Sequence, residues 1–124
     1  MKLHVVEGRY AVARLDARDP IPSWVRGVFT SITRTRDELS IVCDDDAVPN
    51  DVHAERGWRC LAVEGPIPFA TYGVASKITT ALADASISVF LIATYDTDYI
   101  LVKEDVFARA CDALAGAGFG PIGT

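Results

Sequence analysis

The chain has 124 residues, half of them apolar, and a formal net charge of −5 at pH 7. This length matches one average domain, and the apolar fraction is enough to build a core. An acidic chain lacks the positive footprint that nucleic acids and anionic membranes require, so neither is expected as a partner. The first residues contain no signal-peptide core and no apolar run approaches a membrane span, so a cytoplasmic protein is expected.

Alternating apolar and polar residues, rich in β-branched side chains, predict six strands. The strands lie at Tyr10–Asp16, Val28–Thr33, Glu38–Cys43, Trp58–Glu64, Ser88–Tyr95 and Tyr99–Glu104. Two shorter strands are expected near the ends, one at Lys2–Val6, paired across Glu7 and Gly8, and one beginning at Phe119. The polar segments 34–37 and 96–98 separate strand patterns and are predicted to be hairpin turns.

An apolar stripe predicts a helix between the fourth and fifth of these strands. Its members recur at helical spacing: Val74, Ile78, Ala81, Leu82 and Ala85. A second helix is expected at Asp105–Ala115, with Asp105 as its N-cap and glycines after its end. A shorter helix is expected at Pro49–Glu55, because proline suits the first turn of a helix.

The sequence repeats itself with an insertion in its second half. A Pro-Ile-Pro triplet begins at Pro20 and again at Pro66, 46 positions later, whereas Thr33 and Thr94 in the hairpin segments are 61 positions apart. The 15 extra residues coincide with the helix predicted after position 73. The chain therefore divides into a shortened N-terminal subdomain, residues 1–57, and a complete C-terminal subdomain, residues 58–124.

The complete half follows the order strand, helix, strand, strand, helix, which is the split βαβ or ferredoxin-like order. The predicted fold class is α+β, with two tandem ferredoxin-like subdomains, antiparallel sheets and helices on one face of each sheet. The other sheet face then needs a partner surface, so a homodimer is expected.

No catalytic or metal-binding constellation emerges from the sequence. Cys43, Cys60 and Cys111 are widely spaced and predicted to be free structural thiols, and His4 and His53 have no ligand-like spacing to them. His53 is expected on the surface of the short helix. The run Asp44-Asp45-Asp46 favours a solvated loop over a cation site, because it lacks the spaced ligands of a calcium loop. No cofactor is expected, and an enzyme with a site assembled across subunits is the least favoured hypothesis.

Two segments carry more chemistry than a scaffold needs. The loop from Glu64 to Val74 ends in free N–H groups at a helix start, where a carboxylate can bind; a rigid proline-set loop is the alternative. The turn from Thr94 to Asp98 offers carboxylates to a cation; local side-chain bonding within the turn is the alternative.

The same residues carry a family resemblance. The stretch from Ile87 to Val102, with Thr94-Tyr95 and Asp98 in its turn, resembles the ACT domains of the CASTOR type, which are related to the regulatory ACT domains of aspartate kinases. The segment from Ser31 to Ser40 is similar to the companion half of small bacterial tandem ACT proteins. The resemblance covers about residues 8 to 119.

This resemblance implies a regulatory sensor without catalysis, which binds an amino acid between subdomains or between protomers. The residues implied to contact the ligand are Gly73, Val74, Thr94, Tyr95 and Asp98, with Ser31 and Ile32 from the facing half. Backbone groups of Gly73 and Val74 would meet the ligand carboxylate, and Asp98 would take its ammonium or cationic end. The alternative is a ligand-free dimerisation or protein-interaction module.

Overall fold

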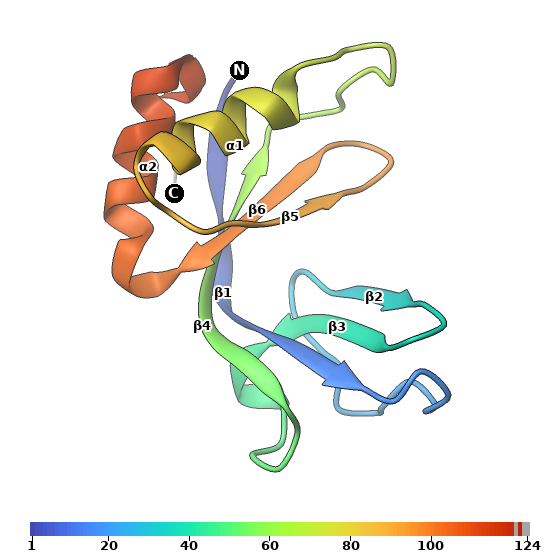
Figure 1. The fold of residues 1–124 in the computed structure, drawn as a ribbon. Helices are drawn as coiled ribbons and strands as arrows, with labels where there is room; N and C mark the ends of the chain where they lie inside the picture. The colour runs from blue at the N-terminus through green and yellow to red at the C-terminus, as the bar shows by residue number, and fades with distance from the viewer. Residues whose placement is uncertain (121, 123–124) are drawn as a thin grey trace. The chain divides into compact units, whose positions relative to one another are not determined.

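The computed structural model describes residues 1–120 and 122 and contains six strands and two α-helices (Figure 1). The elements are β1 (Leu3–Leu15), β2 (Ser31–Arg34), β3 (Leu39–Asp44), β4 (Ala54–Val63), α1 (Val74–Asp84), β5 (Phe90–Ala93), β6 (Asp98–Lys103) and α2 (Phe107–Leu114). Short 3₁₀ turns follow β3 and β6, at Asp45–Ala47 and Glu104–Val106.

The chain forms two compact units whose boundaries fall inside β1 and β4. One unit comprises Met1–Val6 and Arg59–Thr124, and the other comprises Glu7–Trp58. The two long strands therefore each contribute residues to both units. They run antiparallel, because Lys2 accepts a hydrogen bond from Glu64 N–H while Arg14 N–H donates to His53.

The first unit, which is discontinuous in sequence, has the strand order β1-β4-β6-β5. Strands β5 and β6 pair antiparallel, from Phe90 opposite Leu101 to Ala93 opposite Asp98. Both helices cover one face of these strands (Figure 1). Alternate residues of the strands meet the apolar stripes of the helices in one core, which contains Leu3, Leu61, Val63, Ile78, Leu82, Ile87, Ile100, Val102, Ala110, Leu114 and Phe119. This is a ferredoxin-like order in which the start of β1 occupies the place of the closing strand.

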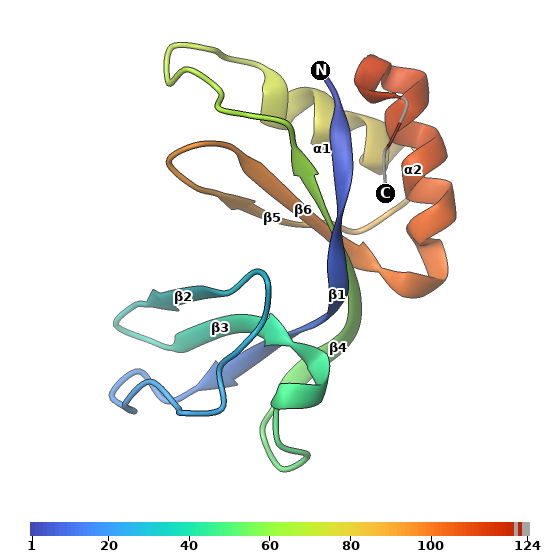
Figure 2. The ribbon, with the colours of Figure 1, turned by 180° about the vertical axis from the view of Figure 1, so that it is seen from behind.

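The second unit, Glu7–Trp58, has the strand order β2-β3-β1-β4. Strand β3 pairs antiparallel with β1, from Tyr10 opposite Asp44 to Leu15 opposite Leu39, and antiparallel with β2 on its other side. Its core contains Ala11, Ala13, Leu39, Ile41, Cys43, Ala47 and Val48. The described connection from β1 to β2 has no helix (Figure 2).

The spacing of corresponding strands in the two halves is more regular in the structure than the sequence match indicated. Strands β2 and β5 begin 59 positions apart, at Ser31 and Phe90, and β3 and β6 also begin 59 positions apart, at Leu39 and Asp98. The strands before these hairpins, β1 and β4, end 48 positions apart, at Leu15 and Val63. The difference of 11 equals the length of α1, which has 11 residues.

The counterpart of Thr94 is therefore Thr35 and not Thr33, and the predicted insertion of 15 residues was too long. Both threonine N–H groups donate across their turns at 2.9 Å, from Thr35 to Glu38 and from Thr94 to Thr97. The two Pro-Ile-Pro triplets are not equivalent positions of the repeat, because they have the same sequence but lie at different distances from the ends of β1 and β4.

Most predicted elements are confirmed, the N-terminal strand among them, but the break after that strand, one connecting segment and the C-terminal segment were predicted wrongly. Strand β1 does not break at Gly8, which has a φ of +109° and lies beside the Tyr10 ring, and it continues to Leu15. Residues 49–53 form a turn in place of the predicted helix, with Val52 N–H donating to Pro49 at 3.1 Å. Arg56 holds this segment by donating to the carbonyls of Val48 and Pro49.

The C-terminal segment differs from the expectation in two ways. Helix α2 begins at Phe107 after a 3₁₀ turn, so Asp105 lies within that turn and does not cap the helix. Phe119 ends a π-helical turn and is 3% exposed in the core, in place of starting a strand. The closing position at that edge of β4 is already filled by β1.

Two of the three cysteines are fully buried in strands, as predicted. Burial raises the pKa of the Cys60 thiol from its ordinary 9.0 to about 12. Burial likewise raises the pKa of Cys43, with Asp44 adding to the effect and a backbone hydrogen bond from Arg26 opposing it. Cys60 therefore stays protonated in the native state at pH values where the thiol of the unfolded chain ionises.

Because of this difference, Cys60 should make the protein less stable as pH rises above 9. Between pH 9 and 11, the unfolding free energy of the parent protein should fall by roughly 1.4 kcal/mol per pH unit more than that of Cys60→Ala. Below pH 9 the two profiles should run parallel, since the thiol is protonated in both states. Urea unfolding at several pH values measures this difference, and parallel profiles up to pH 11 would contradict it.

Candidate ligand site

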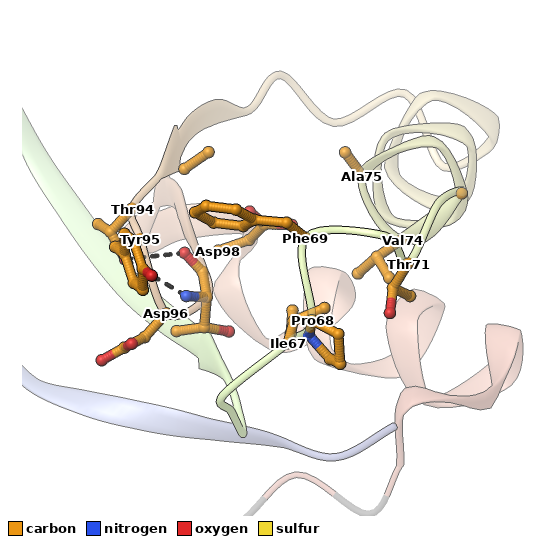
Figure 3. A pocket seen from close by; sticks show the side chains of 13 residues that line it. Ile67, Pro68, Phe69, Thr71, Val74, Ala75, Thr94, Tyr95, Asp96 and Asp98 are labelled. Atoms are coloured by element: carbon orange, nitrogen blue, oxygen red, sulfur yellow. Dashed lines mark hydrogen bonds between the residues drawn. The ribbon is translucent and has the colours of Figure 1, made fainter.

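A cavity of about 310 Å³ lies in the unit that contains both helices (Figure 3). Its walls are the loop after β4, the start of α1 and the turn between β5 and β6. The lining residues are Ile67, Pro68, Phe69, Thr71, Gly73, Val74, Ala75, Ala93, Thr94, Tyr95, Asp96, Thr97 and Asp98. Its size is at the lower end of the range for small-molecule sites.

The first turn of α1 presents unpaired backbone donors to this cavity. Gly73 is the N-cap with a φ of +87°, a conformation that glycine adopts without strain, and no described side chain caps the helix. The first intrahelical bond runs from Lys77 N–H to Gly73 at 3.0 Å. The N–H groups of Val74 and Ala75 have no acceptor within the helix, so this wall is partially positive.

The opposite wall is a turn that is held by its own hydrogen bonds. The Thr94 hydroxyl donates to the Thr97 carbonyl at 3.0 Å, and the backbone N–H of Thr94 donates to the same oxygen. The Thr97 hydroxyl is buried and donates to the Val63 carbonyl at 2.7 Å, which fixes the turn to the end of β4. The turn therefore presents Tyr95, Asp96 and Asp98 from a rigid base.

The loop after β4 is fastened to this turn at one point. Ile67 N–H donates to the Asp96 carbonyl at 2.7 Å. Gly65 comes so close that a Cβ there would lie 3.1 Å from both the Asp96 carbonyl oxygen and Thr97 Cβ. Beyond this point the Phe69 and Tyr95 rings meet edge to face at 4.7 Å between centroids, although they are 74% and 80% exposed.

The charges of the cavity are divided between its two walls. Asp96 and Asp98 lie on the turn, and none of the described lining residues is lysine, arginine or histidine. Figure 3 shows the turn with both aspartates on one side, Val74 and Ala75 on the other and Phe69 between them, and the Asp96 side chain points away from the helix. A negative wall opposite partially positive backbone groups suits a zwitterion that carries an ammonium and a carboxylate.

Five of the predicted ligand residues line this one cavity, namely Gly73, Val74, Thr94, Tyr95 and Asp98. Ser31 and Ile32 lie on β2 in the other unit, and their part in a ligand site stays a prediction. Sequence reasoning selected the two segments but did not single out Phe69 or Asp96. The neighbouring Pro66-Ile67-Pro68 triplet was a signal for Phe69, since it directs the loop towards the turn.

The described part of the chain holds no group of three or more histidine, cysteine or acidic side chains placed to bind a metal ion. His53 is exposed just before β4, so its predicted helix is wrong but its surface position is confirmed. Among the helices that the structure describes, none has the length and apolarity needed to cross a membrane.

Comparison with known families agrees with the fold and with the predicted resemblance. The family model of the ACT domain matches residues 53–116, more than half of the chain, so the chain belongs to the ACT domain family. A second family model, for an N-terminal domain, matches residues 8–51.

Individual relatives extend the similarity over most of the chain. A crystal structure from Agrobacterium tumefaciens has a TM-score of 0.91 and 39% identity, and the match covers 99% of this chain and 93% of that one. The regulatory subunit of aspartate kinase from Thermus flavus shares the fold, with a TM-score of 0.68 at 12% identity, over 95% of this chain and 97% of that one.

Curated relatives include the cytosolic arginine sensor for mTORC1 subunit 1 of Bos taurus, which is 28% identical over 139 residues. The match covers 93% of this chain and 42% of the sensor. The human protein CASTOR3P is 33% identical over 98 residues, which cover 68% of this chain and 60% of that protein. The chain thus spans between two fifths and three fifths of the length of these relatives.

Proposed function

We propose that this protein is a regulatory sensor that binds a free amino acid in the cavity between α1 and the β5–β6 turn, without catalysing a reaction. The observation that carries the proposal is that a negatively charged turn and an uncapped helix start line the same cavity, which has a volume of about 310 Å³. The relatives support it, since one is an arginine sensor by name and another is the regulatory subunit of an aspartate kinase.

In this proposal the N–H groups at the start of α1 bind the ligand carboxylate. Asp98, which begins β6 and is half-buried, takes the ammonium or a cationic side chain. Thr94 and Tyr95 line the pocket, and Phe69 packs against the aliphatic part of the ligand. We further propose that the protein acts in the cytoplasm as a homodimer, whose association changes with ligand.

A thermal-unfolding screen with the twenty amino acids at millimolar concentration tests the proposal. A ligand present at 100 times its Kd stabilises the native state by about 2.7 kcal/mol, which is several degrees in the midpoint for a chain of this size. At least one amino acid should therefore raise the midpoint, and Asp98→Asn should remove most of that rise.

Asp84→Asn is the matched control, because Asp84 is exposed at the last position of α1 and lies outside the cavity. This control should keep the full response to the amino acid. If no amino acid moves the midpoint of the parent protein, the ligand-free interaction module becomes the better account.

A further inference from the structure

A second cavity of about 280 Å³ lies in the same unit and shares two wall residues with the first. Thr71 and Val74 line both cavities, whereas Gly73 lines only the first and Tyr72 only the second. The remaining residues of the second cavity are Met1, Lys77, Ala117, Gly118 and Phe119. The two hollows are therefore separated by the short segment that leads into α1.

The second cavity has the opposite charge to the first. Lys77 is the one charged side chain among its described lining residues, and no carboxylate lines it. Lys77 lies one turn into α1, and no hydrogen bond or ion pair to a carboxylate holds its ammonium in the described part of the chain. Lys77 is exposed, and its ammonium, which has no carboxylate beside it among these lining residues, can pair with the carboxylate of a ligand.

The rest of this lining is apolar or carries hydroxyl groups. Phe119 is 3% exposed, and with Val74, Ala117 and Met1 it supplies an apolar surface. The hydroxyls of Thr71 and Tyr72 are additional donors near the rim, where Tyr72 is 95% exposed. The described lining offers a cation for a carboxylate and apolar surface for an alkyl chain, but no carboxylate for an ammonium, so it matches an aliphatic acid better than a zwitterion.

From this arrangement we infer that the second cavity is a separate binding site for a small aliphatic carboxylate. The carboxylate pairs with Lys77, and the alkyl chain packs on Val74, Ala117 and Phe119. The site differs from the proposed amino-acid site in its ligand class, its charge and its charged residue, although Thr71 and Val74 line both cavities. Binding here needs neither Asp98 nor the β5–β6 turn.

Titration with 4-methylpentanoate, followed by ¹H–¹⁵N NMR of the full chain, tests this inference. The acid should shift the amide signals of Lys77, Ala117 and Gly118 with a millimolar Kd. The neutral isostere 4-methylpentanamide should bind roughly tenfold more weakly, and Lys77→Met should weaken binding of the acid by a similar factor. Lys103→Met, which removes a lysine outside both cavities, should leave the Kd unchanged.

Ala117→Leu provides a second variant that fills the cavity without changing charge. Ala117 is exposed, so the fold should tolerate the larger side chain while binding of 4-methylpentanoate is lost. Equal affinity for acid and amide, or an unchanged Kd in Lys77→Met, would overturn the inference. Shifts confined to the Thr94–Asp98 turn would also overturn it, whereas loss of amino-acid binding in Asp98→Asn bears only on the first site.

Discussion

Deletion of Met1–Val6 should unfold the unit that carries both cavities. These residues belong to that unit although they precede the rest of it by more than fifty positions. Leu3 is 1% exposed in the core, Val6 is 8% exposed, and Lys2 accepts the hydrogen bond of Glu64 N–H at 2.9 Å. Each buried aliphatic side chain contributes about 1.5–3 kcal/mol, so the deletion removes a large part of an ordinary domain's stability of about 5–15 kcal/mol.

Single substitutions on the same strand should lower the unfolding free energy by an amount that depends on how deeply the side chain is buried. Leu3→Ala should lower the unfolding free energy by about 2–5 kcal/mol, because it leaves a cavity in the core. His4 is the next residue but is exposed, so His4→Ala should change that free energy by less than about 0.5 kcal/mol. Urea unfolding measures both, and equal effects of the two substitutions would show that the strand does not close this core.

Gly65→Val should damage the candidate amino-acid site without altering any ligand-contacting side chain. The new Cβ would sit 3.1 Å from the Asp96 carbonyl oxygen and from Thr97 Cβ, on a turn that is fixed to Val63. The loop must then move away from the turn and lose the bond from Ile67 N–H to Asp96. The expected cost is about 1–3 kcal/mol of stability, typical of overpacking, and amino-acid binding should weaken by at least about tenfold.

Gly116→Val is the matched control for this substitution. Gly116 lies in the same unit, its φ is outside the left-handed region, and a Cβ there has no neighbour within 4 Å. The control should keep its stability within about 0.5 kcal/mol and should keep its ligand affinity. Thermal unfolding with and without the amino acid found in the screen separates the two variants. A Gly65→Val protein that responds like the control would show that the loop is not held in place by this contact.

Sequence reasoning predicted best where structure follows from local periodicity. The helix stripe from Val74 to Ala85 matches α1, which spans Val74–Asp84, and both hairpin turns lie where polar residues separate strand patterns. These elements depend on residues within a few positions of one another. The two segments that line the cavity could be selected for the same reason, since a turn and a helix start are both local features.

The errors lie where long-range pairing overrides local signals. Pro49 and the residues after it fit a helix start, but Arg56 binds the carbonyls of Val48 and Pro49, and β4 begins at Ala54. Phe119 fits a strand, but the edge beside β4 is taken by residues from the other end of the chain. The size of the cavity could not be predicted either, because it depends on the bond from Ile67 to Asp96 across 29 positions.

The sharing of β1 and β4 has a consequence for any attempt to dissect the protein. No single cut of the backbone releases either unit whole, since one unit is assembled from two separated stretches of chain. A protease that nicks the exposed loop near Asn50 should leave fragments that stay associated through these two strands until denaturant is added. To obtain the site-bearing unit as one continuous polypeptide, its first strand would have to be joined after α2 in a circularly permuted gene.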